Sequence, residues 1–286
     1  MSSEVTANGD PVTIQCKDSA LPDAWPDRPI ATFRRILSTL LFGGGAVELP
    51  AQLPGRDALP DYLLREFHRV PNGYYSRLLV RGYERGFERA MLGSMDRNRD
   101  WLARAVQGRQ AVLDIGCGSG KVIGAVAQTG VRDLWGLDAS PYQLCIAAAD
   151  FPEVSFVQGL AENMPFEDAR FDAVTACFLF HELPAEMQDA VLLEVRRVLK
   201  PGGLLAISEP SPMQLSTANP FTLFRLAGLR GWYFALLARF VTEPYVEQWH
   251  ARDLRAWAEC QGFTVQQDAQ GIPFRQLILQ LRRGRT

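Results

Sequence analysis

The residues best placed to do chemistry in this chain form a glycine-rich stretch flanked by two acids. The stretch AVLDIGCGSG, residues 111–120, begins as a short apolar run with Asp114 near its end. Three glycines follow the acid: Gly116, Gly118 and Gly120. Glycines at a strand end let the backbone turn sharply and approach a ligand closely. A second acid, Asp138, ends the next apolar run, where an acid about 20 residues past the loop accepts hydrogen bonds from ribose. The pattern predicts an adenosine cofactor site.

The position of Asp114 separates two classes of cofactor. Nicotinamide dinucleotides rest a pyrophosphate on the helix N-terminus that follows such a loop. An acid directly before the glycines repels a pyrophosphate, so a nicotinamide oxidoreductase is the disfavoured alternative. The same acid suits the cationic, ammonium-bearing end of S-adenosylmethionine.

Four segments in succession resemble the motifs of class I S-adenosylmethionine-dependent methyltransferases: VLDIGCGSG, LDAS, GLAENMPFEDARFDAVTACFLFHEL and LKPGGLLAISEP. The similarity covers residues 108–286 and points to the ubiquinone/menaquinone C-methyltransferase-like group, which acts on small molecules. The resemblance implies an α/β fold with a Rossmann-like, seven-stranded, mostly parallel sheet and helices on both faces. It also implies an enzyme that uses S-adenosylmethionine as its methyl donor.

The resemblance further implies which residues meet the cofactor. Asp114 would orient the methionine ammonium, and the three glycines would line the amino-acid and ribose parts. Asp138 would bind the ribose diol, with Ala139 beside the adenine. Backbone carbonyls near Cys177 would also face the ammonium group.

The third motif departs from the pattern of the family. Relatives usually read GDAENLPF, whereas this chain has Leu160 where an acid would accept a hydrogen bond from the adenine amino group. Adenine would then be held by the Ala161 backbone, by packing or by Glu162. A neutral hydrogen bond contributes about 0.5–1.5 kcal/mol, so cofactor binding need not be lost.

Candidate catalytic residues follow the fourth predicted strand. His181 is the leading general base, because histidine titrates near neutral pH, and a structural role is its alternative. Glu182 is a second candidate, as a base or as a carbocation stabiliser. Tyr74, Tyr75, Trp232 and His250 are the residues expected to close a substrate pocket. His68 is expected on the surface of a cap helix.

The alternation of elements predicts how these residues are positioned. Residues 1–29 are polar and aperiodic and indicate a flexible tail, 30–107 a helical N-terminal cap, and 108–286 the core. Within the cap, residues 61–70 have helix-like apolar spacing. The predicted strands are 111–115, 133–137, 154–158, 171–177, 204–208, 263–268 and 275–281. The predicted helices of the core are 120–129, 140–149, 184–199 and 251–261.

An insertion at 210–250, after the fifth strand, is unusually apolar and aromatic. Arg225, Arg230 and Arg239 interrupt its centre, which argues against a membrane span. A lid over the substrate is the favoured interpretation; packing against the cap and peripheral membrane contact are the alternatives. Apolar pockets bind apolar ligands, so the acceptor is expected to be a small lipophilic quinone, polyketide, terpenoid or aromatic metabolite. Carbon and oxygen acceptors both stay open.

Composition narrows the possible partners, metal sites and cellular locations of the protein. The net charge is −2 and no basic stripe is present, which disfavours a nucleic-acid partner. The five cysteines are scattered, which indicates reduced thiols and no zinc site, and no metal is expected. The first residues lack a signal-peptide pattern, so a cytoplasmic location is expected. An RNA or protein methyltransferase and a non-catalytic fold partner remain as alternative functions, and no oligomeric state is indicated.

Overall fold

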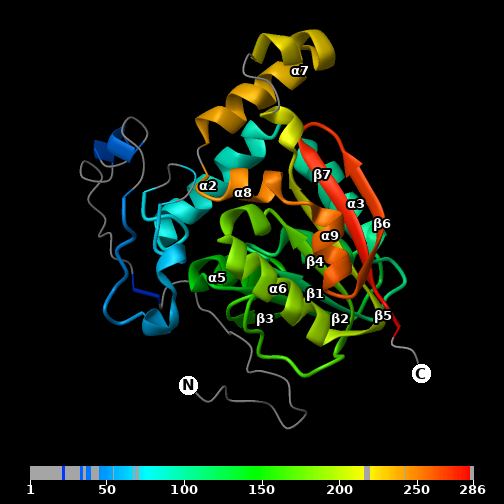
Figure 1. Ribbon diagram of the computed structural model, residues 1–286. Coiled ribbons are helices and arrows are strands. Elements are labelled where there is room, and N and C mark those ends of the chain that lie inside the picture. Colours follow the sequence, from blue (N-terminus) through cyan, green and yellow to red (C-terminus); the bar gives the residue numbers. More distant parts are fainter. Residues whose placement is uncertain are drawn as a thin grey trace.

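The computed structural model describes residues 21–22, 33–34, 37–39, 45–53, 55–66, 68, 71–215, 220–241 and 243–283. Its centre is a seven-stranded sheet in the order β3-β2-β1-β4-β5-β7-β6 (Figure 1). The strands are β1 (Ala111–Ile115), β2 (Asp133–Asp138), β3 (Ser155–Gln158), β4 (Phe171–Cys177), β5 (Leu199–Pro210), β6 (Phe263–Gln270) and β7 (Phe274–Leu281). The first five pair in parallel, and β7 is antiparallel to both β5 and β6. The predicted Rossmann-like, mostly parallel sheet is confirmed.

Helices cover both faces of the sheet. One face carries α3 (Ser94–Ala105), α4 (Lys121–Ala127) and α5 (Pro141–Asp150), and the other carries α6 (Ala185–Val198), α8 (Val246–Ala251) and α9 (Leu254–Cys260). Successive strand residues point to opposite faces, so Val112 packs with the first set and Leu113 with the second. The sheet edge beyond the C-terminal strand ends stays open for a ligand.

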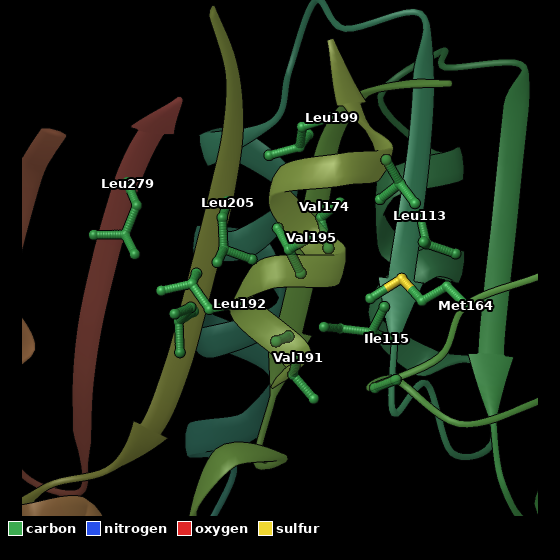
Figure 2. Close-up of a cluster of buried hydrophobic side chains, with 14 of the residues drawn as sticks. Leu113, Ile115, Met164, Val174, Val191, Leu192, Val195, Leu199, Leu205 and Leu279 are labelled. Carbon is green, nitrogen blue, oxygen red and sulfur yellow. The ribbon is translucent and has the colours of Figure 1, made fainter. Parts of the chain in front are cut away.

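The spacing of apolar residues explains how α6 is held. Val191, Leu192, Val195 and Val198 recur at helical intervals and are fully buried. Figure 2 shows the first three lying over side chains of β1, β4 and β5. Burial of each such side chain contributes about 1.5–3 kcal/mol, so this face is rigid support for the loop that precedes α6.

The segments before β1 differ in part from expectation. The helix predicted at 61–70 is wrong where it is described, because only the 3₁₀ turn η3 (Asp61–Leu63) forms and Arg65 then pairs with Ala46 in a β-bridge. A second 3₁₀ turn, η2 (Arg56–Ala58), precedes it. The helix α2 (Arg77–Ala90) follows, and α3 packs on α4 and β5 although it falls within 30–107. Most of the 1–29 segment lies outside the described residues.

The remaining differences have local causes. β5 begins at Leu199 rather than 204 because Leu199 pairs with Phe171 before a bulge, in which Gly202 has a left-handed φ of 84°. The helix predicted at 251–261 corresponds to α9, which begins at Leu254 because the Asp253 carboxylate caps it, and α8 ends at Ala251 as a separate helix. Cys117, Cys177 and Cys260 are free as expected, whereas Cys145 is disulfide-bonded, so the expectation of reduced thiols is wrong there.

The insertion after β5 contains the 3₁₀ turn η6 (Pro212–Gln214) and the long helix α7 (Pro220–Phe240). Gly228 has φ 67° and ψ −165°, values that interrupt the helix and divide it into two halves. The first half projects away from the sheet at the top of Figure 1, and the second passes close to α2. Among the described residues, none of the helices, α7 included, combines the length and apolarity needed to cross a membrane.

Candidate active site

A cavity of about 630 Å³ lies beyond the C-terminal ends of β1, β2 and β4. One end is lined by the glycine loop, the acids that flank it and the loop after β3. The other end is lined by α2, the second half of α7 and the 3₁₀ turn η5 (Phe180–Glu182). The sheet thus brings the predicted cofactor motifs to one end of a single cavity and the predicted lid to the other.

The glycine loop has the backbone that its composition predicts. Gly116, Gly118 and Gly120 have φ values of 62°, 53° and 77°, in the left-handed region that glycine adopts without strain. A Cβ on Gly116 would lie 2.8 Å from Cδ1 of Leu179, so any side chain here would force Leu179 to move. The Gly118 N–H donates to Asp138 Oδ2 at 2.8 Å, and the Ser140 N–H donates to Oδ1 at 2.8 Å. Asp138 therefore ties the ends of β1 and β2 together.

Asp114 lines the cavity with an unsatisfied carboxylate oxygen. Its side chain is buried, and Oδ1 accepts a hydrogen bond from the Thr175 hydroxyl at 2.7 Å. Oδ2 is also buried and has no hydrogen-bond partner among the described residues. Burial raises the pKa of Asp114 to about 7. A buried, unpaired carboxylate oxygen is costly unless a ligand satisfies it, and a cationic ammonium group fits that requirement.

Asp138 keeps hydrogen-bonding capacity for a ligand. Each of its oxygens accepts one backbone N–H, and a carboxylate has about four acceptor sites. Burial raises the pKa of Asp138 to about 6, and the nearby Glu182 charge adds to the effect. The neighbouring Tyr75, one of the expected pocket residues, is buried beside it and lines the same cavity.

The residues expected around adenine share one stretch of cavity wall: Ala139, Leu160, Ala161 and Glu162. The Ala139 carbonyl accepts a hydrogen bond from Gln158 Nε2 at 3.2 Å. The Tyr62 hydroxyl donates to Glu162, and burial together with this carboxylate raises the pKa of Tyr62. Glu162 is therefore held in place by a residue that the sequence did not single out.

His181 lies behind the cavity wall rather than on it. Its side chain is buried, and Nδ1 is 2.5 Å from Glu209 Oε2. Its Nε2 is 3.0 Å from Glu243 Oε2, in an ion pair without hydrogen-bond alignment. Burial lowers the pKa of His181, but the charges of Glu243 and Glu209 outweigh this and raise it well above the usual value. A histidine already protonated between two carboxylates cannot take up a proton, so the geometry favours the structural alternative.

Glu182 lines the cavity and belongs to the same group of charges. Its Oε1 accepts the Tyr74 hydroxyl at 2.8 Å and lies 2.8 Å from His68 Nε2. His68 Nδ1 is 3.1 Å from Glu243 Oε1. The expectation that His68 is a surface residue is wrong, because its side chain is 9% exposed. We call His68, His181, Glu182, Glu209 and Glu243 the buried charge network.

Two acids of the network, Glu209 and Glu243, were missed from the sequence, although each carried a signal. Glu209 ends a buried apolar strand at the same sheet edge as Asp114 and Asp138. Glu243 is the first acid after Glu209, following a long stretch of the insertion without Asp or Glu. Phe178 was missed too: it lines the cavity directly after β4 with a strained φ of 59°.

The other expected residues fall in different places. Cys177 lines the cavity, with Asn98 Nδ2 3.4 Å from its sulfur. His250 also lines it, with Nε2 3.0 Å from the Pro210 carbonyl oxygen, and burial lowers the pKa of its ring. Trp232 does not line the cavity and packs near Phe221 instead. The α7 residues that do line it are Phe234, Leu237, Ala238 and Phe240.

The comparisons with known proteins agree with this geometry. The family described as methyltransferase domain matches residues 112–203. A demethylmenaquinone methyltransferase of Paenarthrobacter aurescens is 30% identical over 203 residues, 70% of this chain and 74% of that protein. An uncharacterized methyltransferase of Synechocystis is 43% identical over 104 residues, 36% of this chain and 48% of that protein. Matches to demethylmenaquinone methyltransferases of two Chlorobaculum species span 40% of those proteins.

Among solved structures, an O-methyltransferase family protein from Burkholderia thailandensis has the same fold. Its TM-score is 0.51 at 18% identity, over 70% of this chain and 59% of that one. The sheet order, the glycine loop and the open strand edge thus define a class I methyltransferase fold. The chain belongs to the S-adenosylmethionine-dependent methyltransferases, in the group that resembles quinone C-methyltransferases.

Proposed function

We propose that this enzyme transfers the methyl group of S-adenosylmethionine to a ring carbon of a small lipophilic acceptor, a quinol or a similar hydroxylated aromatic compound. The relatives named demethylmenaquinone methyltransferase support a quinone-type acceptor. The observation that carries the proposal is a cavity whose two ends differ. Acids and glycines line one end, and aromatic and aliphatic side chains line the other, with Glu182 among the wall residues.

The residues of the polar end fit S-adenosylmethionine. The unpaired Oδ2 of Asp114 would accept the ammonium group, and Asp138 has acceptor capacity left for the ribose diol. The left-handed backbone at Gly116 and Gly118 lets this loop turn sharply at the cavity wall, as close approach to a ligand requires. Bound S-adenosylmethionine supplies a methyl group on a cationic sulfur, so the protein has to orient the acceptor and exclude water.

The apolar end fits a flat, lipophilic acceptor. Met91, Met95 and Phe234 form a buried cluster there, against which Phe87 and Phe178 pack. Phe87 and Phe178 meet edge to face with ring centroids 5.8 Å apart. Binding sites of this kind use apolar walls with few polar groups, and those few fix the orientation of the ligand.

Glu182 is the polar group that we assign to the acceptor. Tyr74 and His68 both bind Oε1, which fixes the side chain and leaves Oε2 without a hydrogen-bond partner among the described residues. In this role Oε2 accepts the proton of the acceptor hydroxyl. A phenolate carries negative charge at the ring carbons ortho to its oxygen, so removing this proton makes the ortho carbon the nucleophile. After methyl transfer that carbon loses its ring hydrogen as a proton to solvent while Glu182 returns its proton to the oxygen, which restores the aromatic ring.

The test is methyl transfer to a chemically reduced 2-prenyl-1,4-naphthoquinone, followed by the mass of the product and by S-adenosylhomocysteine formation. NMR of the product distinguishes a carbon-bound from an oxygen-bound methyl group. Glu182→Gln should lower kcat by about 100-fold, the contribution of a positioned general base, without changing cofactor affinity. Glu186→Gln, an exposed acid on α6, is the matched control. An equal loss of cofactor affinity in Glu182→Gln, or turnover with RNA and with no quinol, would contradict the assignment.

A further inference from the structure

The first half of α7 is an apolar helical segment with little protein around it. Every side chain described in 221–230 is exposed. Phe221 is 65% exposed, Phe224 48% and Leu229 67%. Isolated helices shorter than about 12 residues are marginal in water, and their stability comes from burying an apolar face against a partner. Phe221 contacts Trp232 of the second half of α7, yet the described side chains of this segment stay exposed.

Positive charge accompanies this apolar surface. Helix α7 contains Arg225, Arg230 and Arg239 and no acidic residue. Arg225 and Arg230 are exposed, and the Arg230 guanidinium lies 5.5 Å over the Phe234 ring. Exposed aromatic and aliphatic side chains beside arginines are the composition of segments that lie in a membrane interface with anionic lipids.

The neighbouring helix α2 continues the basic surface. The Tyr233 hydroxyl of α7 donates to the Ala90 carbonyl at 2.8 Å, so the C-terminal end of α2 contacts the second half of α7. Arg85 and Arg89 are exposed on α2, one helical turn apart. The acid Glu88 of the same helix is instead paired with Arg99 and Lys121. The outward charge contributed by this part of α2 is therefore positive.

The cavity reaches the protein surface along α7. Phe240 lines the cavity and is 51% exposed. Gly86 and Ala90 of α2 and Leu237 of α7 also line it, so these two helices form the wall nearest the exposed segment. We propose that residues 221–230 of α7 dock on an anionic lipid bilayer, with Arg85 and Arg89 against the headgroups, and that the cavity thereby faces the membrane.

The positive charge of this surface favours an anionic bilayer over a second copy of the chain as its partner. Two copies meeting through α7 would bring Arg225 and Arg230 toward the same residues of the partner, with no acid on the helix to compensate them. Phospholipid headgroups supply that negative charge. The docking surface stands independently of the proposed acceptor, since the described residues of 221–230, together with Arg85 and Arg89, do not line the cavity.

The test is co-sedimentation of the full chain with vesicles of phosphatidylcholine mixed with phosphatidylglycerol, in the absence of acceptor. Binding should fall with added salt and be much weaker on phosphatidylcholine alone. Phe221→Ser with Phe224→Ser should weaken it about a hundredfold, since burial of each phenyl group contributes at least about tenfold in affinity. Leu193→Ser, a similarly exposed apolar residue on α6, should have no effect.

The charge variants test the second half of the proposal. Arg85→Gln with Arg225→Gln should weaken vesicle binding about fivefold per arginine, whereas Arg132→Gln, an exposed arginine before β2, should not. Unchanged S-adenosylmethionine affinity shows that each variant is folded. Equal binding of wild type and the Phe221/Phe224 variant would overturn the proposal. A dimer in analytical ultracentrifugation that this variant dissociates, without vesicle binding, would overturn it in favour of self-association.

Discussion

Replacing His68 by glutamine removes one cation of the buried charge network while keeping a side chain of similar reach. Burial alone lowers the pKa of His68, but the hydrogen bonds and charges of Glu182 and Glu243 outweigh it and raise the pKa from 6.5 to about 9. The folded-state pKa lies above the unfolded one, so protonated His68 stabilises the fold. The difference of about 2.5 in pKa corresponds to about 3 kcal/mol, at 1.36 kcal/mol for each unit.

The stabilisation that His68 provides depends on pH. The contribution of His68 is complete below about pH 6.5 and is lost as pH rises through about 9. His68→Gln should therefore lower the free energy of unfolding by about 3 kcal/mol at pH 6, and by under about 0.5 kcal/mol at pH 10. His181 is present in both proteins, so its own titration largely cancels in the difference.

The assay is urea denaturation of wild type and His68→Gln across this pH range. Equal m-values in the two proteins show that the variant unfolds from a comparably compact state. A stability difference that stays the same at both ends of the range would refute the reasoning. It would mean that His68 is uncharged and contributes through packing alone.

Three further predictions concern the cofactor end. Asp114→Asn should weaken S-adenosylmethionine binding at least tenfold in calorimetry, and wild-type affinity should itself fall below about pH 7 as Asp114 takes up a proton. Asp138→Ala should weaken binding at least tenfold, and unchanged affinity would remove the ribose assignment. Gly116→Ala should cost about 1–2 kcal/mol of stability from its left-handed φ, plus the clash with Leu179, and adding Leu179→Ala should recover only the second part in thermal denaturation.

The sheet could be predicted because its signals are local. The apolar runs of β1 and β4 and the glycines after β1 lie within a few residues of one another, and the bounds of both strands agree with those predicted. The start of β5 was predicted five residues too late, because its first residues pair with β4 around a bulge. This pairing depends on a partner strand that is distant in sequence.

The charge network could not be predicted in the same way. His68 and Glu182 are 114 positions apart, and helix-like apolar spacing around His68 suggested an exposed position that the described fold does not have. His181 could be located after β4, but its protonation depends on Glu209 from the next strand and Glu243 from the insertion. A motif identifies the residue, whereas the charges that surround it decide its chemistry.

Glu209 links the turn after β4 to the insertion after β5. The Leu179 and Phe180 N–H groups both donate to its Oε1 at 2.9 Å, while Oε2 faces the His181 ring. One carboxylate thus shapes the turn η5 at the cavity wall and, through His181, the anchorage of Glu243. A different insertion placed after β5 would therefore have to supply an acid in the position of Glu243. Without that acid, His181 would keep Glu209 as its one remaining carboxylate partner among the described residues.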